Sequence, residues 1–192
     1  MNFAESESWL ERSKKVIPGA AQTFSKGTNQ FVNGVSPIFL SHGKGAHVWD
    51  VDGNKYIDYI QGLLPNILGY ANEEVNQAFY EQVDRGHSFS LPHPLEVTLA
   101  EKLCEIIPCA EMVRFGKNGS DATAGAVRLA RAYTGRDHVA CCGYHGWQDW
   151  FIGSTTRNLG VPQAVRELTH PFVYNDIASL ETIFAKFDQK VA

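Results

Sequence analysis

Long hydrophobic runs are absent from this chain of 192 residues. No apolar stretch approaches the roughly 18–20 residues that a membrane-spanning helix requires. Basic runs are absent too, and the net charge of −4 argues against a nucleic-acid partner. The first residues, MNFAESESWLERSKK, are too polar and too acidic for a secretory signal. These absences predict a protein that contacts neither membrane nor nucleic acid.

Cysteine is scarce, and its four positions fit neither a disulfide framework nor a zinc site. Cys141 and Cys142 are adjacent on an apolar segment, so with His138 they would point to opposite faces of a strand rather than converge on a metal. Cys104 and Cys109 flank an Ile-Ile-Pro segment. We expect four buried free thiols, no metal site and a reducing, cytoplasmic location.

The N-terminal third is predicted to contain a helix, an irregular loop and a small antiparallel sheet. Residues 5–17 have helical amphipathic spacing up to Pro18, and residues 19–36 are polar and read as a loop. Residues 38–40 and 46–49 are strand candidates. Asp52-Gly53 between two apolar segments predicts a two-residue hairpin turn with positive φ angles.

The rest of the chain predicts alternating helices and strands. The expected elements are helices at 72–86, 95–107, 121–133 and 177–187, and strands at 112–115 and 138–142. Asn72 should cap the first of these helices, and Gly135 should end the third. The helix at 121–133 should pack through Ala122, Ala126, Leu129, Ala130 and Tyr133. Two strands joined through a helix predict a parallel sheet with a right-handed crossover, and so an α/β fold.

Two short segments in this α/β region have the composition of a binding site. Gly116-Lys117-Asn118-Gly119-Ser120-Asp121 leads from a predicted strand into a helix N-terminus, where main-chain N–H groups and the helix dipole stabilise an anion such as a phosphate. The alternative is a plain N-cap in which Ser120 or Asp121 satisfies the free N–H groups. Gly143-Tyr144-His145-Gly146-Trp147 offers an aromatic side chain between glycines, which suits a flat ring. The P-loop, the dinucleotide-binding glycine motif and the G-x-S-x-G elbow of hydrolases are absent.

These segments, with others in order along nearly the whole chain, resemble the class III (fold type I) pyridoxal-phosphate aminotransferases, and most closely the branch that contains glutamate-1-semialdehyde aminomutase. The segments that carry the resemblance include IPG at 17–19, GKGA at 43–46, WDVDGN at 49–54, YIDY at 56–59, ILGY at 67–70, LEV at 95–97, NGSDA at 118–122, RLAR at 128–131 and YHG at 144–146.

The resemblance implies a fold and a set of roles. Residues 1–60 would contribute to the small domain, and residues 61–192 would form the first part of the large domain that binds pyridoxal 5′-phosphate (PLP). Asn118, Gly119 and Ser120 would hold its phosphate, where the family usually has Ser-Gly-Thr-Glu-Ala. Tyr144 would stack on the pyridine ring. His145 would either contact the cofactor or brace the loop.

The substrate side departs from the aminomutase pattern. Thr23 and Lys26 are the candidate substrate residues, with Lys26 where the aminomutase has an arginine, and Leu63 lies near the place of a tryptophan. Lysine attracts an anion but cannot grip a carboxylate through two bonds. These departures favour an aminotransferase acting on another amino donor and a keto or aldehyde acceptor, with the aminomutase as an alternative. Residues 19–27 could also be only a structural loop.

No lysine of this chain matches the position of the family's Schiff-base lysine, so the resemblance implies no catalytic residue within residues 1–192. The chain would be the N-terminal part of an enzyme whose full-length form is a homodimer, and would be inactive by itself. The other interpretation is a non-catalytic module that binds a phosphorylated ligand or a partner chain.

Overall fold

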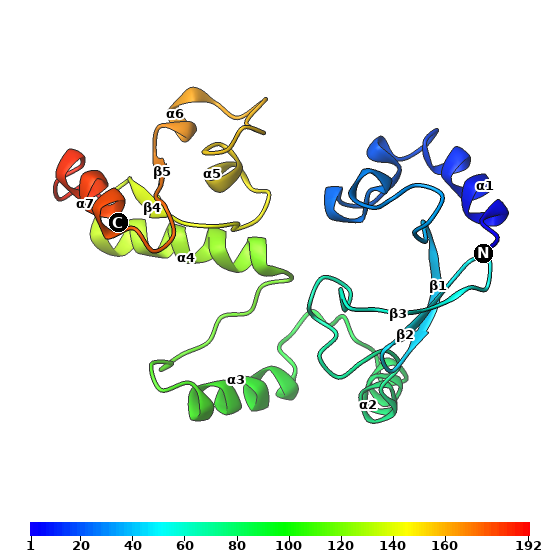
Figure 1. The fold of residues 1–192 in the computed structure, drawn as a ribbon. Coiled ribbons are helices and arrows are strands. Elements are labelled where there is room, and N and C mark those ends of the chain that lie inside the picture. The colour runs from blue at the N-terminus through cyan, green and yellow to red at the C-terminus, as the bar shows by residue number, and fades with distance from the viewer. The chain divides into compact units, whose positions relative to one another are not determined.

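The computed structural model describes all 192 residues, and the chain divides into two compact units, Met1–Leu91 and Pro92–Ala192 (Figure 1). The predicted boundary after residue 60 concerns the small and large domains of the resembling family and stays a prediction. No helix has the length and apolar character needed to cross a membrane; the longest, α4, has 16 residues.

The first unit is built around a three-stranded antiparallel meander. Its elements are helix α1 (Ala4–Ser13), strands β1 (Leu40–Lys44), β2 (His47–Asp50) and β3 (Lys55–Ile57), and helix α2 (Glu73–Val83). The polar segment between α1 and the sheet contains only three short 3-10 turns, as its composition predicts. Helix α1 ends earlier than predicted, at Ser13. Asn72 caps α2 as predicted, its side chain accepting from the N–H of Val75 at 3.1 Å.

The connection between β2 and β3 corrects the predicted two-residue turn. It contains four residues, and of Asp52 and Gly53 only Gly53 has a positive φ, +84°. The reason is Asp50, which is 1% exposed and accepts from the N–H groups of Asp52 (3.1 Å) and Asn54 (2.7 Å). Burial raises the pKa of Asp50, but hydrogen bonds from Asn54, Tyr56 and Asp52 outweigh it, so the pKa lies below its ordinary value.

The same connection fixes the N-terminal helix. Helix α1 has no side-chain cap of its own. Instead the carboxylate of Asp52 accepts from the N–H groups of Glu5 (2.8 Å) and Ser6 (3.0 Å) and from the Ser6 hydroxyl (2.6 Å). A carboxylate at a helix N-terminus is favoured by the helix dipole. The hairpin therefore serves as a distant cap for α1, across more than forty residues of sequence.

The second unit is a small parallel α/β assembly. Its helices are α3 (Pro94–Ile106), α4 (Gly119–Thr134), α5 (Asp149–Ile152), α6 (Gln163–Arg166) and α7 (Ile177–Lys186), and its strands are β4 (Val139–Cys141) and β5 (Thr169–Pro171). Strands β4 and β5 pair in parallel, and Val191 forms a parallel bridge with His138. A parallel sheet is present as predicted, but it pairs β4 with β5 and not with residues 112–115. The bridge at Val191 was not predicted.

Two predictions about this unit are wrong. Residues 112–115 form no strand because no other segment pairs with them, and Met112 is 91% exposed. Leu129 and Tyr133 on α4 are also exposed, and the helix instead turns Thr123 and Val127 toward the strand β4. Alanines lie on α4 between the face with Leu129 and Tyr133 and the face with Thr123 and Val127. Helical spacing alone could therefore not show which of the two faces packs on the sheet. Gly135 ends α4 in the left-handed conformation (φ +68°), as predicted.

The cysteines are free, as predicted, but their burial differs: Cys141 is buried and Cys109 is exposed. Burial raises the pKa of the Cys141 thiol, so this group is protonated at neutral pH. No group of three or more His, Cys, Asp or Glu residues gathers in an arrangement that could hold a metal ion.

Candidate functional site

The turn before α4 presents unused hydrogen-bond donors. Asn118 is the N-cap, and its side-chain oxygen accepts from the N–H of Asp121 at 3.0 Å. The N–H groups of Gly119 and Ser120 and the Ser120 hydroxyl have no partner in the chain. A Cβ atom built on Gly119 would meet no atom within 4 Å, so the space before the turn is open. Capping by Asn118 thus satisfies one donor and leaves three for an anion.

The loop after β4 presents an exposed aromatic ring. Tyr144 is 77% exposed, and its ring meets Phe151 edge to face with the centroids 5.6 Å apart. This edge contact leaves most of the ring uncovered. A flat ligand could therefore stack on Tyr144 while its edges stay free for hydrogen bonds.

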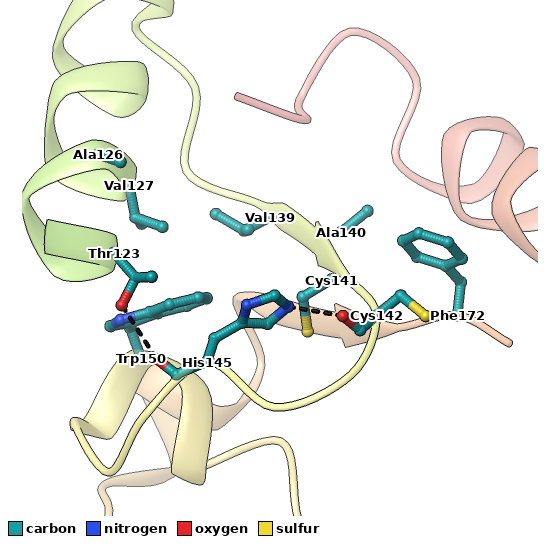
Figure 2. A pocket seen from close by; sticks show the side chains of 10 residues that line it. All are labelled: Thr123, Ala126, Val127, Val139, Ala140, Cys141, Cys142, His145, Trp150 and Phe172. Carbon is teal, nitrogen blue, oxygen red and sulfur yellow. Dashed lines mark hydrogen bonds between the residues drawn. The ribbon is translucent and has the colours of Figure 1, made fainter. Parts of the chain in front are cut away.

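His145 is half-buried and braces the loop (Figure 2). Its Nε2 atom lies 2.7 Å from the carbonyl oxygen of Cys142. A carbonyl only accepts, so Nε2 carries the proton and donates. The imidazole also packs on Trp150 and Phe151, with centroids 6.0 and 5.4 Å away. These contacts brace the loop, and the predicted contact of His145 with the cofactor stays a prediction.

The turn and the loop are joined by contacts that the sequence did not predict. The Thr123 hydroxyl, on the second turn of α4, lies 2.9 Å from the main-chain oxygen of His145 (Figure 2). The side-chain amide of Gln148 donates to Asp121 at 3.3 Å. Gly146 lies so close to Ser120 that a Cβ atom would overlap its hydroxyl. No sequence motif could have shown these links. The bond from Thr123 ends on a main-chain oxygen, which every residue has, and the approach of Gly146 to Ser120 requires only that residue 146 has no side chain.

A family model for aminotransferase class-III matches residues 30–189. The chain belongs to the class III aminotransferases. The 3-aminobutyryl-CoA aminotransferase of Cloacimonas acidaminovorans (strain Evry) is 43% identical, over 95% of this chain and 44% of that protein. The glutamate-1-semialdehyde 2,1-aminomutase of Syntrophomonas wolfei subsp. wolfei (strain DSM 2245B / Goettingen) is 39% identical, over 100% of this chain and 47% of that protein.

Solved structures agree on the fold of this class III aminotransferase chain. The FumI protein of Sphingopyxis sp. MTA144, solved with PLP, matches with a TM-score of 0.86 and 34% identity, over 95% of this chain and 43% of that chain. The chain therefore spans about half the length of the relatives that it matches. The predicted family and mixed α/β fold are confirmed.

A cavity of about 390 Å³ lies beside these links, between α4 and β4 of the aminotransferase chain (Figure 2). Its lining is mostly apolar, and the indole N–H of Trp150 is buried there without an acceptor. The residues that line it are Thr123, Ala126, Val127, Val139, Ala140, Cys141, Cys142, His145, Trp150 and Phe172. The cavity lies next to the turn and the loop, and Thr123 and His145, whose hydrogen bond joins the two segments, both line it.

The predicted substrate residues belong to the first unit. Thr23 is exposed and extended, directly before the 3-10 turn Phe24–Lys26, and Lys26 is exposed. The main-chain N–H of Lys26 bonds to the carbonyl of Thr23 at 3.1 Å, so one turn presents both side chains to solvent. Their role toward a substrate stays a prediction.

A strained loop in the first unit was also not predicted. Gln61, Leu63 and Leu64 have positive φ angles of +52°, +71° and +78°. Asp58 anchors the loop at both ends, accepting from the N–H of Ile60 (2.8 Å) and from the hydroxyl of Tyr70 (2.6 Å). Backbone strain of this kind persists only where surrounding contacts enforce it, and it clusters at functional sites.

Proposed function

We propose that this chain supplies the phosphate-binding and ring-stacking part of a PLP-dependent aminotransferase. The enzyme moves an amino group from an amino donor to a keto or aldehyde acceptor. The observation that carries the proposal is the set of unused donors at Gly119 and Ser120, joined by hydrogen bonds to the loop that exposes Tyr144. Membership in the class III family supports the same assignment.

The residues present fit PLP. Gly119 and Ser120 would hold the phosphate through their main-chain N–H groups and the Ser120 hydroxyl, at the positive end of the α4 dipole. Tyr144 would hold the pyridine ring flat, and His145 would keep the Tyr144 loop in place. When bound, PLP supplies an electron sink for the bonds broken at the amino-bearing carbon of the substrate. Thr23 and Lys26 would attract an anionic group of the substrate.

The chain alone is proposed to be inactive, with no catalytic residue among its 192 residues. None of its lysines matches the family's reactive position, and PLP chemistry needs such a lysine. We extend to the whole enzyme the family's usual homodimer and a cytoplasmic location. We also propose that the first 60 residues contribute to the small domain and the remainder to the large domain.

Lys26 favours an aminotransferase over glutamate-1-semialdehyde 2,1-aminomutase. The aminomutase relative is 39% identical, and the aminotransferase of 3-aminobutyryl-CoA is 43% identical. A lysine in place of arginine loses the two-bond grip on a carboxylate. A second candidate is a non-catalytic module that binds a phosphorylated ligand or a partner chain. The lack of a matching lysine favours it, and the intact turn and loop weigh against it.

Pyridoxamine 5′-phosphate is the probe that tests cofactor binding, because its amine forms no adduct with surface lysines. We expect it to quench the tryptophan fluorescence of the 192-residue chain, and we expect unphosphorylated pyridoxamine to bind at least about tenfold more weakly. Tyr144→Ala should weaken binding, whereas Tyr174→Ala, at an exposed tyrosine on another loop, should not. Equal binding of the two compounds, or equal effects of the two variants, would refute the proposal.

The proposed inactivity has a separate test. Borohydride reduction of the PLP-treated chain should fix the cofactor on no single lysine. Specific labelling of one lysine would show that the chain contains the reactive group.

A further inference from the structure

We propose that Thr123 is a positioning residue that sets where the ring of Tyr144 lies relative to the phosphate turn. It would act through the hydrogen bond from its hydroxyl to the main-chain oxygen of His145. The proposal rests on the proposed function, because it assigns the two segments to one cofactor. The hydrogen bond itself is a property of the chain without any ligand.

The donor and the acceptor are matched. The Thr123 hydroxyl has one proton and two acceptors within reach, the His145 oxygen at 2.9 Å and the Ser120 oxygen at 3.1 Å. The bond to Ser120 is the local bond that threonines commonly form to the preceding turn of their own helix. The bond to His145 joins segments 22 residues apart and is the shorter of the two. The His145 carbonyl has no other donor, so losing the hydroxyl would leave it unpaired in a part-buried position.

The position of Thr123 explains why this bond would place the ring. Ser120 and Thr123 are three residues apart on α4 and so lie on the same side of the helix. His145 directly follows Tyr144, whose ring is 77% exposed and meets Phe151 edge to face. The position of this ring therefore depends mainly on the main chain that carries it. Of the two hydrogen bonds between the loop and α4, only the one from Thr123 is accepted by the main chain of the loop, and it is the shorter.

The first test needs no ligand. Tyr144 and Trp147 are 77% and 73% exposed, so chymotrypsin can reach the loop once it moves. Cleavage after these two residues, measured relative to cleavage after the exposed Tyr174, should become at least about fivefold faster in Thr123→Val, which keeps the shape but lacks the hydroxyl. Thr123→Ser, which restores the donor, should return cleavage to the wild-type rate. The matched control is Thr182→Val, because Thr182 makes only a bond within its own helix, to Ala178 at 2.8 Å. Unchanged relative cleavage after Tyr144 and Trp147 in Thr123→Val would overturn the proposal.

The second test separates positioning from general damage. Thr123→Val should weaken pyridoxamine 5′-phosphate binding by about five- to tenfold, the loss expected for one hydrogen bond to a part-buried carbonyl. Binding of inorganic phosphate, which needs only the turn, should stay within about twofold of wild type. Equal loss for both probes, or no rescue by Thr123→Ser, would overturn the proposal.

Two further outcomes are distinguishable. If the wild-type chain does not prefer the phosphorylated probe over pyridoxamine, the proposed function fails, and the cleavage experiment still decides whether Thr123 orders the loop. If Thr123→Val does not fold, Thr123→Ala removes the hydroxyl without the added methyl group. Unaltered relative cleavage after Tyr144 and Trp147 in a folded Thr123→Ala protein overturns the proposal in the same way.

Discussion

Gly146→Ala should be among the most damaging single-methyl additions in the second unit. Gly146 is buried, and its φ of +109° lies where residues with a side chain are rarely found. A Cβ atom at this position would overlap the Ser120 hydroxyl oxygen and lie 2.8 Å from the Ser120 Cβ and 3.1 Å from its Cα. The last of these atoms belongs to the helix itself. The clash therefore cannot be relieved by rotating the serine side chain.

The magnitude has two parts. Forcing a side chain into this backbone region costs about 1–3 kcal/mol. Displacing Ser120 and the start of α4 adds about 1–3 kcal/mol, as other overpacking changes do. The total of roughly 2–6 kcal/mol is a large share of the 5–15 kcal/mol that is typical for folded domains. Gly143→Ala is the matched control because Gly143 also has a positive φ, +81°, but a Cβ atom there would meet nothing within 4 Å.

Urea unfolding followed by tryptophan fluorescence measures both variants. We expect Gly146→Ala to lose at least about 1 kcal/mol more than Gly143→Ala. When Ser120 is also replaced by glycine, most of this extra loss should disappear, because the serine side chain that the new methyl group would strike is no longer there. Equal losses for the two glycine variants, or a loss that Ser120→Gly leaves unchanged, would refute the claim that the loop is seated on Ser120.

Three further predictions concern packing and pH. Asp50→Asn should cost about 2–4 kcal/mol in urea unfolding, because one amide oxygen cannot replace a buried carboxylate with four hydrogen bonds. The lowered pKa of Asp50 contributes stability that is present above about pH 4 and lost as pH falls further, and a variant with an unchanged acid transition would contradict this. Burial and the charge of His138, whose Nδ1 atom lies 2.9 Å from Nε2 of His170, lower the pKa of His170. Stability should therefore fall as pH drops below about 6.5, and His170→Gln should flatten this dependence between pH 5 and about 7. Leu129→Ala should change the free energy of unfolding by less than about 0.5 kcal/mol, and Val127→Ala by more than about 1 kcal/mol. The reverse order would mean that α4 packs through the face with Leu129, as the sequence predicted.

Features fixed by neighbouring residues were predictable, and features fixed by distant partners were not. The cap at Asn72 and the left-handed end of α4 at Gly135 follow from side chains within a few positions. The segment 112–115 has the composition of a buried strand, but a strand also needs a pairing partner, which composition does not report. The turn at Gly53 is different again, because the residue that shapes it, Asp50, is close in sequence but belongs to the strand before the turn. Its carboxylate accepts from the N–H groups of Asp52 and Asn54 and so determines the shape of the turn.

The candidate site divides in the same way. Its two segments could be found from sequence because each has a distinctive local composition: glycines before a helix, and an aromatic residue between glycines. Their connection could not be found, since Thr123 reads only as an ordinary helix residue. His145 was given two predicted roles. Its contacts with the Cys142 carbonyl and with Trp150, which brace the loop, arise only in the fold, and its contact with the cofactor stays a prediction.

A site made mainly of main-chain groups tolerates changes of side chain better than changes of backbone shape. At the turn this chain has Asn-Gly-Ser-Asp-Ala where the resembling family usually has Ser-Gly-Thr-Glu-Ala, yet the free N–H groups of Gly119 and Ser120 do not depend on which side chain follows. At Gly146 the requirement is geometric, because any side chain would meet Ser120. Thr123 falls between these cases: serine could supply its hydroxyl, and valine could supply only its shape. We therefore expect a change of the acid at position 121 to be tolerated best, loss of the hydroxyl at position 123 less well, and any side chain at position 146 least.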